Sequence, residues 1–170
     1  IPPMIGHGAP TLEAAGGRAC GTWTPFDWEA SGQSIPSRVQ ALARRHPERL
    51  AVFDVERQLT YAELDRAANR VANSLLVLQG PAPEAVLLMF DVGVAGIVAA
   101  LGVFRAGKYL VGVEPTFSPD RIAQIAEDAG TTILLADRAT EQAARSLAGS
   151  RLTVAFIDDF DATADDAPDV

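Results

Sequence analysis

The feature that most constrains the fold is the alternation of short apolar runs with helical segments after residue 84. Continuous runs of Val, Ile, Leu and other apolar residues are typical of buried parallel strands. The runs occupy residues 85–90, 109–113, 132–136 and 152–157. Amphipathic or apolar helical patterns separate them, at residues 94–107, 118–130 and 138–149. Strands alternating with helices of this length require crossover connections, so we predict an α/β fold with a parallel sheet and helices on both faces.

The boundaries of these helices are marked by capping residues. Ser118 is a predicted N-cap, Pro119 suits the first helical position, and Gly130 is a predicted stop. The next helix is expected to begin at an Asp137 cap and to stop at Gly149. Helix ends at these positions agree with the alternation.

Residues 34–78 precede the alternating part and are predicted to form a helix, a hairpin and a second helix. The first helix ends before Pro47, and residues 50–61 form two short strands about a polar turn. The second helix starts with Thr60 and Glu63 at capping-box spacing, with Leu59 and Leu64 placed for a hydrophobic staple. Its predicted apolar face comprises Leu64, Ala68, Val71, Leu75 and Leu78. Nothing in this stretch needs to touch a substrate.

Composition excludes several classes of protein. At 48% hydrophobic and 21% charged residues, the chain of 170 residues is globular, and no apolar run approaches the length that spans a bilayer. The net charge of -8 arises mainly in residues 158–170, which hold six aspartates and no Lys or Arg. The rest is nearly neutral, so we expect neither nucleic-acid nor membrane binding. The single Cys20 suits a reducing compartment, and a cytoplasmic location is expected.

The sequence divides into three zones. Residues 1–33 are rich in Gly, Pro and Ser and are interpreted as an extension or linker, in which Trp23, Phe26 and Trp28 form an aromatic group expected to pack onto the body. Residues 34–157 form the body, and residues 158–170 an acidic, solvated tail or a truncated continuation. Because the first residue is Ile1 rather than Met, we expect the sequence to begin inside a longer chain.

One stretch has some features of a phosphate-binding turn. Gly93 and Gly96 follow a predicted strand and open a helix, but the third glycine and the lysine of the usual nucleotide loops are missing. Close packing of the helix on the sheet explains both glycines equally well. Asp91 lies at the carboxyl end of its strand, where open α/β sheets often bind ligands, and a helix-capping carboxylate is the more ordinary interpretation.

Other candidate residues have simpler explanations. His7 and His46 have no Cys or carboxylate at metal-ligand spacing, and His46 suits a solvated helix C-terminus. Glu127 and Asp128 suit the polar face of their helix, and Lys108, the only lysine, suits a solvent-facing turn. No G-x-S-x-G motif is present. The residues therefore predict no catalytic group and no metal site, and they leave any cofactor-binding residue unknown.

Two segments together resemble the beginning of the adenylate-forming enzymes, most closely the amino-acid adenylation domains of nonribosomal peptide synthetases. The segment LTYAELDRAANRVANSLL (59–76) is similar to the family's L-[ST]-Y-x-E-L signature. The segment LGVFRAGKYLVGVEPTFSPDRIAQIAEDAGTTILLAD (101–137) is similar to a second family segment, L-K-A-G-x-x-Y-V-P-L-D-P followed by P-x-x-R-[IL]. It departs from that pattern at Arg105, Gly112 and Glu114, where lysine, proline and aspartate are usual.

The resemblance implies an enzyme that activates a carboxylic acid with ATP and Mg²⁺ to an acyl-adenylate. Such enzymes then pass the acyl group to a thiol, often the phosphopantetheine of a carrier protein. The family's phosphate loop, adenosine site, acid pocket and catalytic lysine match nothing in these 170 residues, and Lys108 does not correspond to that lysine. The two matched motifs are scaffold elements, so the segment alone is expected to be inactive and to bind ATP and Mg²⁺ weakly at most.

Three hypotheses follow from the sequence. The first is the N-terminal part of a larger amino-acid-activating ligase, whose partners are the remainder of the adenylation domain and a carrier protein. The second is a non-catalytic, stand-alone interaction domain. The third is a flavodoxin-like nucleotide-binding module with Asp91, Gly93 and Gly96 at its site. A parallel sheet that ends after four strands leaves an open edge, so self-association is also expected.

Overall fold

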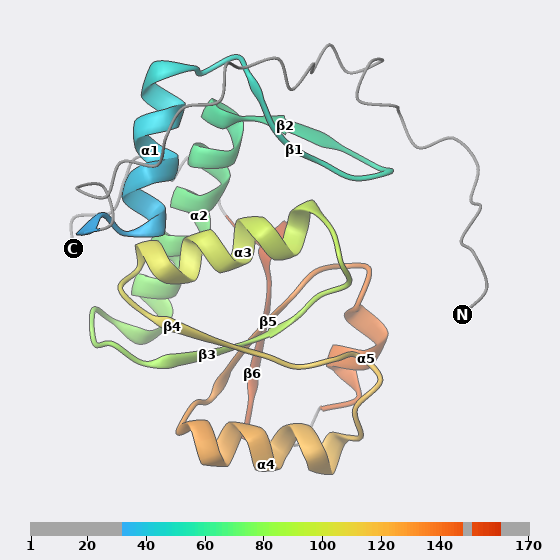
Figure 1. Cartoon of the computed structure of the whole chain (residues 1–170). Coiled ribbons are helices and arrows are strands. Elements are labelled where there is room, and N and C mark those ends of the chain that lie inside the picture. The colour runs from blue at the N-terminus through green and yellow to red at the C-terminus, as the bar shows by residue number, and fades with distance from the viewer. Residues whose placement is uncertain (1–31, 148–150, 161–170) are drawn as a thin grey trace.

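A central parallel sheet with helices on both faces organises the computed structural model, which describes residues 32–147 and 151–160 (Figure 1). The sheet has four strands in the order β4-β3-β5-β6, all parallel. These strands are β3 (Ala85–Met89), β4 (Tyr109–Gly112), β5 (Ile133–Ala136) and β6 (Thr153–Phe156). Each lies within one of the four apolar runs, so the predicted α/β class with its parallel sheet is confirmed.

The remaining elements precede the sheet or connect its strands. Before the sheet come α1 (Ile35–Arg45), the antiparallel pair β1 (Leu50–Phe53) and β2 (Gln58–Thr60), and α2 (Tyr61–Gln79). The connections contain α3 (Val94–Arg105), α4 (Pro119–Ala129) and α5 (Glu141–Arg145), and the 3-10 helix η2 (Ile157–Asp159) follows β6.

Local chemistry explains most helix boundaries. The Thr60 side chain accepts a hydrogen bond from the Glu63 amide, and the Glu63 carboxylate accepts one from the Thr60 amide, as a capping box requires. The hydrogen bonds from Thr60, its backbone amide first, lower the pKa of Glu63. Ser118 caps α4, and Gly130 ends it in the left-handed conformation with a φ of 65°. These predicted boundaries are confirmed.

The helix α5 is shorter than predicted. It begins at Glu141, and Thr140 rather than Asp137 holds the N-cap position. Asp137 is nevertheless bound to this turn, because its Oδ1 accepts a hydrogen bond from the Thr140 amide at 3.0 Å. The predicted stop, Gly149, lies outside the described residues.

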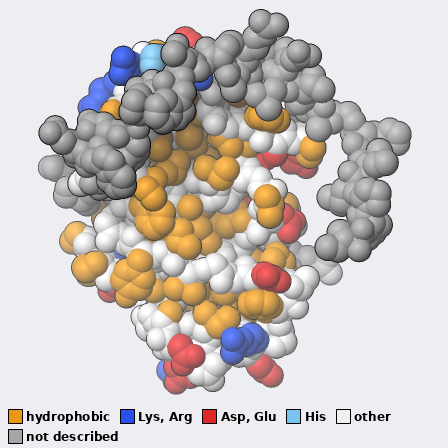
Figure 2. Space-filling view, in the orientation of Figure 1, with side chains coloured by type: hydrophobic (Ala, Val, Ile, Leu, Met, Phe, Trp, Pro, Cys, Tyr) orange, Lys and Arg blue, Asp and Glu red, His pale blue; other side chains and the backbone are white. Residues whose placement is uncertain are grey.

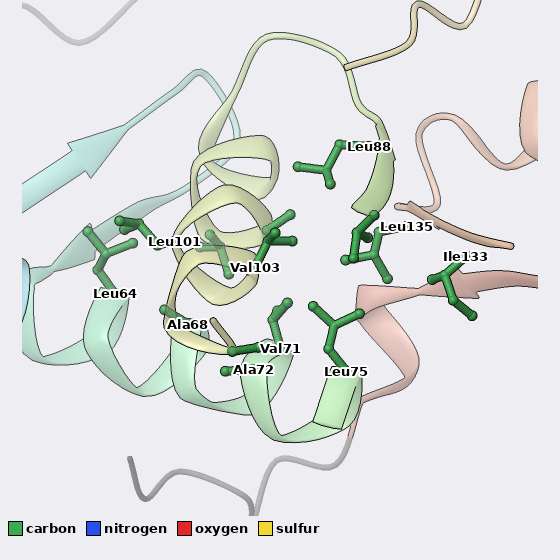
Figure 3. Packing of buried hydrophobic residues seen from close by; sticks show 14 of the residues in the cluster. Leu64, Ala68, Val71, Ala72, Leu75, Leu88, Leu101, Val103, Ile133 and Leu135 are labelled. Atoms are coloured by element: carbon green, nitrogen blue, oxygen red, sulfur yellow. The ribbon is translucent and has the colours of Figure 1, made fainter. Parts of the chain in front are cut away.

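The two faces of the sheet bury different side chains because successive residues of a strand point to opposite sides. Val86 and Leu88 of β3 face α2 and α3, whereas Leu87 and Met89 face α4 and α5. Figure 3 shows α2 and α3 meeting over the first face, where Leu75 lies beside Leu135 of the sheet. All of the predicted α2 face is buried except Leu78, which is 45% exposed, so that assignment is wrong.

The contact between α2 and α3 depends on a glycine. A Cβ on Gly102 of α3 would overlap the Val71 side chain of α2 and would lie 3.0 Å from the Ala68 carbonyl oxygen. Beside this contact, buried Arg105 pairs with Asp65 at 2.8 Å and also donates to the Asn69 side chain. The two helices are therefore joined by both a close approach and a buried ion pair.

Candidate functional site

The carboxyl edge of the sheet brings together the residues that the sequence indicated. Asp91, Gly93 and Gly96 follow β3, and Glu114 follows β4. They lie around an open depression together with Leu88, Phe90, Val92, Ile97, Ala100, Leu110, Gly112 and Val113. Its lining is mostly apolar, and Val92 is fully exposed. The depression thus offers a ligand a concave surface at the edge that open α/β sheets commonly use.

The charges around this depression do not fit a phosphate group. Among its lining residues only Asp91 and Glu114 are charged, and both are acidic. A nucleotide phosphate needs positive charge or several free backbone amides at a helix N-terminus. The lining supplies no Lys or Arg, so the arrangement favours an apolar surface over an anion site.

The N-terminus of α3 is already occupied by a carboxylate of the protein itself. The Val94 amide donates to Oδ2 of Asp54 at 2.8 Å, and Oδ1 of Asp54 accepts from the amides of Glu56 and Arg57. Asp54 lies in the β1–β2 turn, forty residues before α3. The hydrogen bond from Val94 and those from the turn hold the pKa of Asp54 below its usual value of 3.8. An aspartate at this position uses the amide and the helix dipole that a phosphate would need.

The prediction that Asp91 caps this helix is therefore wrong. Gly93 is the N-cap residue and has no side chain, while Asp91 is exposed. The capping carboxylate comes from the hairpin because its turn folds back onto the start of α3. A sequence separation of forty residues exceeds the spacings that define local caps, so no local pattern could have identified Asp54.

The two glycines of this turn have a packing role. A Cβ on Gly93 would lie 3.0 Å from Oδ2 of Asp54, and a Cβ on Gly96 would lie 3.4 Å from Cβ of Phe90. Side chains at these positions would press against the capping aspartate and against the end of β3. The packing interpretation of the glycines accounts for both contacts without a ligand.

Thr140 connects the loop after β5 to the end of β3. The helices that follow these two strands cover opposite faces of the sheet, which makes this the topological switch point. The Thr140 hydroxyl, which is buried, donates to the Met89 carbonyl oxygen at 2.9 Å. An open depression remains beside Thr140, and it is lined by Asp91, Pro115, Ala139, Thr140, Gln142, Ala143 and Ser146, none of which is Lys or Arg. The flavodoxin-like hypothesis stays a prediction.

Lys108 differs most from its predicted environment. It is 4% exposed, and its ammonium group donates to the Ala82 carbonyl oxygen at 2.8 Å. The prediction of a solvent-facing lysine is wrong because the loop before β3 folds over the start of β4. Lys108 lies at the amino end of the strand, opposite the edge that carries the depression.

The other predicted residues are placed more simply. His46 is exposed at the end of α1, and Glu127 and Asp128 are exposed on α4, as predicted. His7 and the aromatic group Trp23, Phe26 and Trp28 lie outside the described residues. Within residues 32–147 and 151–160, no cluster of three or more His, Cys, Asp or Glu side chains is arranged to hold a metal ion.

The sequence did not indicate the ionic cluster at the end of β5 and β6. The Arg138 guanidinium pairs with Asp159 and Glu141, and the Arg138 amide donates to Asp158 at 3.0 Å. The same guanidinium lies over the Phe156 ring, 4.7 Å from its centroid. Asp158 and Asp159, the first residues of the acidic zone, are thus bound to the body of the molecule.

The model of the AMP-binding enzyme family matches residues 39–169. The chain belongs to the AMP-binding enzyme family. Phosphinothricin tripeptide synthetase PhsC of Streptomyces viridochromogenes is 40% identical over 121 residues, which are 71% of this chain and 11% of that protein. Nonribosomal peptide synthetase 5 of Gibberella zeae is 35% identical over 95 residues, which are 55% of this chain and 1% of that protein.

Solved structures agree with these relatives. The nonribosomal peptide synthetase FmoA3, with alpha-methyl-L-serine-AMP bound, matches with a TM-score of 0.65 and 29% identity over 74% of this chain and 14% of its own. A fatty acid AMP ligase from Legionella pneumophila matches with a TM-score of 0.71 over 83% of this chain and 26% of its own, and its 20% identity supports the fold alone. The resemblance to adenylation domains is confirmed, and the chain spans a small fraction of each relative's length.

Proposed function

We propose that this AMP-binding family chain is the N-terminal part of an ATP-dependent ligase that adenylates an amino acid or another carboxylic acid in nonribosomal peptide synthesis. The observation that carries the proposal is the family match over residues 39–169, together with relatives that are peptide synthetases. The full enzyme then forms an acyl-adenylate and passes the acyl group to the phosphopantetheine of a carrier protein. FmoA3, which is solved with alpha-methyl-L-serine-AMP bound, supports the adenylate-forming step by analogy.

The described residues fit a scaffold role within such an enzyme and do not fit a nucleotide site. The depression at the carboxyl edge is lined by acidic and apolar residues, and Asp54 occupies the start of α3. We therefore assign no residue here to ATP or Mg²⁺ and none to catalysis. The inferred consequence is that these 170 residues alone neither catalyse adenylation nor bind ATP tightly.

The proposed division of the chain follows from this role. Residues 34–157 form the start of the large subdomain of the adenylation domain, residues 1–33 an extension or linker, and residues 158–170 an acidic tail or a truncated continuation. A cytoplasmic location suits a synthetase of this kind. No helix in the described ranges has the length and apolar character needed to cross a membrane.

The test begins with the native protein isolated from its producing cells. We expect an intact mass far above 17.9 kDa and ATP–pyrophosphate exchange that depends on one added amino or carboxylic acid. The 170-residue chain, assayed in parallel, should give no exchange with any acid. A native mass near 17.9 kDa without exchange activity would instead favour a non-catalytic interaction domain.

We also propose that the isolated chain self-associates through the β4 edge. The amides of Tyr109 and Val113 donate to the β3 side, so the alternation along a strand directs those of Leu110 and Gly112 to the open edge. Figure 2 shows hydrophobic side chains gathered on this face over α3 and β4, where Ile97, Phe104 and Tyr109 are partly exposed. An apolar edge strand without charge or proline is a template for pairing with another strand.

Gly112 permits a sharp test of this edge. Proline there removes an amide that faces outward and leaves the β3–β4 hydrogen bonds intact, so it should convert a concentration-dependent dimer into a monomer. A Cβ at Gly112 meets open space, which makes Gly112→Ala a matched control that should still associate. Sedimentation of the 170-residue chain measures both. A wild-type chain that remains monomeric at high concentration would disprove self-association without affecting the proposed ligase function.

A further inference from the structure

An open strand edge and an apolar helix stripe lie next to each other on one side of the molecule. In the part of the chain that the structure describes, β4 pairs with β3 alone, so the amides of Leu110 and Gly112 face away from the sheet. On α3, Ile97, Ala100 and Phe104 follow one another at spacings of three and four residues, which places them on one helix face. Ile97 is 44% exposed and Phe104 is 37% exposed.

The carboxyl-edge depression joins this helix stripe to the strand edge. Ile97 and Ala100 of α3 line it together with Leu110 and Gly112 of β4. Leu110 packs against the cluster under α3, so Gly112, two residues later, is directed to the same face. A Cβ at Gly112 would meet open space. The inward side chains of a strand added beside β4 would therefore find room at Gly112 and an apolar surface at Ile97.

The carboxyl end of this surface is acidic. Asp91 and Glu114 are both exposed, and they are the charged residues among those that line the depression. Glu114 accepts a hydrogen bond from the Thr116 hydroxyl at 3.3 Å, which leaves further acceptor capacity on its carboxylate. The basic residues just before β4, Arg105 and Lys108, are buried and bonded to other groups. This end of the surface is therefore complementary to a strand that carries Lys or Arg there.

A second copy of this chain fits the surface less well than a strand of different sequence. The four residues of β4 are uncharged, and Glu114 follows soon after them, so a copy brings a further carboxylate to the interface. The relatives described above are much longer than this chain, which spans 11% of one and 14% of another. A longer chain can supply a strand from its own remainder at a high effective concentration, so that weak pairing suffices.

We propose that the β4 edge binds an antiparallel strand from a later part of the same enzyme, with apolar side chains toward α3 and basic residues at its N-terminal end. Doubly wound sheets often carry one antiparallel strand at the edge of an otherwise parallel sheet. In this direction the N-terminal end of the added strand lies beside Asp91 and Glu114. Self-association of the isolated chain is then a substitute for the missing strand. The inference rests on the proposed ligase function, because it requires a longer chain.

Peptide binding to the 170-residue chain tests the chemistry of this surface. The probe is a fluorescein-labelled peptide, KKVTVTV, whose alternation gives it one apolar face, and fluorescence anisotropy measures its affinity at low ionic strength. We expect weaker binding by about fivefold or more for EEVTVTV, in which both charges are reversed. The reversed arrangement VTVTVKK should also bind more weakly. An unbound KKVTVTV would overturn the proposal, as would equal or tighter binding of either control peptide.

Matched variants locate the peptide on the surface. Asp91→Asn and Glu114→Gln should each weaken binding of KKVTVTV by about two- to fivefold, as expected for exposed ion pairs, and the difference should vanish in about 0.5 M NaCl. Gly112→Pro should abolish binding, whereas Gly112→Ala should retain it. Glu127→Gln removes an exposed carboxylate from α4 and should have no effect. Binding that is insensitive to both acidic variants, or that survives the proline, would overturn the proposal.

Amide hydrogen exchange of the native full-length enzyme tests the source of the strand. We expect the Leu110 and Gly112 amides to exchange about tenfold or more slowly than in the dilute 170-residue chain, at every protein concentration. Rapid exchange in an enzyme that is active in ATP–pyrophosphate exchange would overturn this inference and leave the ligase function intact. Protection that rises with protein concentration would assign the edge to a second copy and would also overturn it. An inactive native protein of mass near 17.9 kDa would overturn both proposals.

Discussion

Among the described residues, the face of the sheet under α2 and α3 buries a cluster of fifteen, whereas the face under α4 and α5 buries a cluster of nine. The first face uses a nineteen-residue helix that precedes the sheet, a glycine contact and a buried ion pair. In the described part of the chain, the helices on the second face are the crossover helices α4 and α5, and α5 has five residues. The comparison indicates that the specific packing that holds this chain together lies mainly between α2 and α3.

The largest expected loss of stability comes from placing a side chain at Gly102, where α2 and α3 are in close contact. In Gly102→Leu the new side chain must displace Val71, so α2 and α3 separate, and we expect a loss of about 3 kcal/mol or more in unfolding free energy. Urea denaturation measures the loss. Gly112→Ala, where a Cβ meets open space, is the control and should unfold at nearly the wild-type midpoint. Equal stability of Gly102→Leu and wild type would show that the helix contact is not tight.

Substitutions of two neighbouring residues of β5 allow the stability contributed by the two faces to be compared directly. Leu134 and Leu135 are both fully buried, but Leu134 faces α4 and α5 while Leu135 faces α2 and α3. Each Leu→Ala change should cost about 2–5 kcal/mol, with the larger cost at Leu135, because the larger cluster relaxes less around a cavity. Chemical denaturation of the two variants ranks the faces. A larger cost at Leu134 would reverse the comparison.

The ion pair of the first face should depend on which partner is removed. Asp65→Ala leaves the buried Arg105 guanidinium without its carboxylate, for an expected loss of about 3 kcal/mol. Arg105→Met removes the buried charge and should cost less, because methionine fills much of the same space. Thermal unfolding of the two single variants and of the double variant gives the coupling energy. If Arg105→Met were the more destabilising, the pair would be a net stabilising interaction.

The smallest effect is expected at the cap that connects the hairpin to α3. The pKa of Asp54 is lowered in the folded chain, so its contribution to stability is present above the usual value of 3.8 and is lost as the pH falls through the folded value. Asp54→Ala should therefore lower the melting temperature modestly above the usual pKa of 3.8, and its difference from wild type should shrink as the pH falls below that value. Asp91→Ala, which removes the cap that the sequence suggested, is the control and should leave the melting temperature near that of wild type, because Asp91 is exposed and makes no capping hydrogen bond to α3.

The sequence predicted the elements whose causes are local. The four apolar runs, the Thr60–Glu63 capping box and the Ser118 cap each depend on residues a few positions apart. These patterns are sufficient for the α/β class and for most helix boundaries. The resemblance to adenylation domains likewise depended on contiguous segments and is confirmed by the family match.

The sequence could not predict what depends on tertiary contacts. Asp54 caps a helix forty residues away, and Lys108 is buried by a loop from another part of the chain. Gly102 must lack a side chain because Val71 of α2 packs against it in the folded chain. Each effect requires knowing which elements become neighbours. At the candidate site such a tertiary contact decides the outcome, because the Val94 amide, which a phosphate would need, donates to Asp54 of the hairpin.

The strand order also bears on how this chain is synthesised. β3 is synthesised before its two neighbours in the sheet, β4 and β5. Its residues Leu87 and Met89 remain uncovered until α4 is synthesised, and α4 begins thirty residues after β3 ends. During that interval α2 and α3 can cover one side of β3 while the other side stays apolar and exposed. Nascent chains of this length are therefore expected to bind chaperones, and release is expected once residue 129 has emerged.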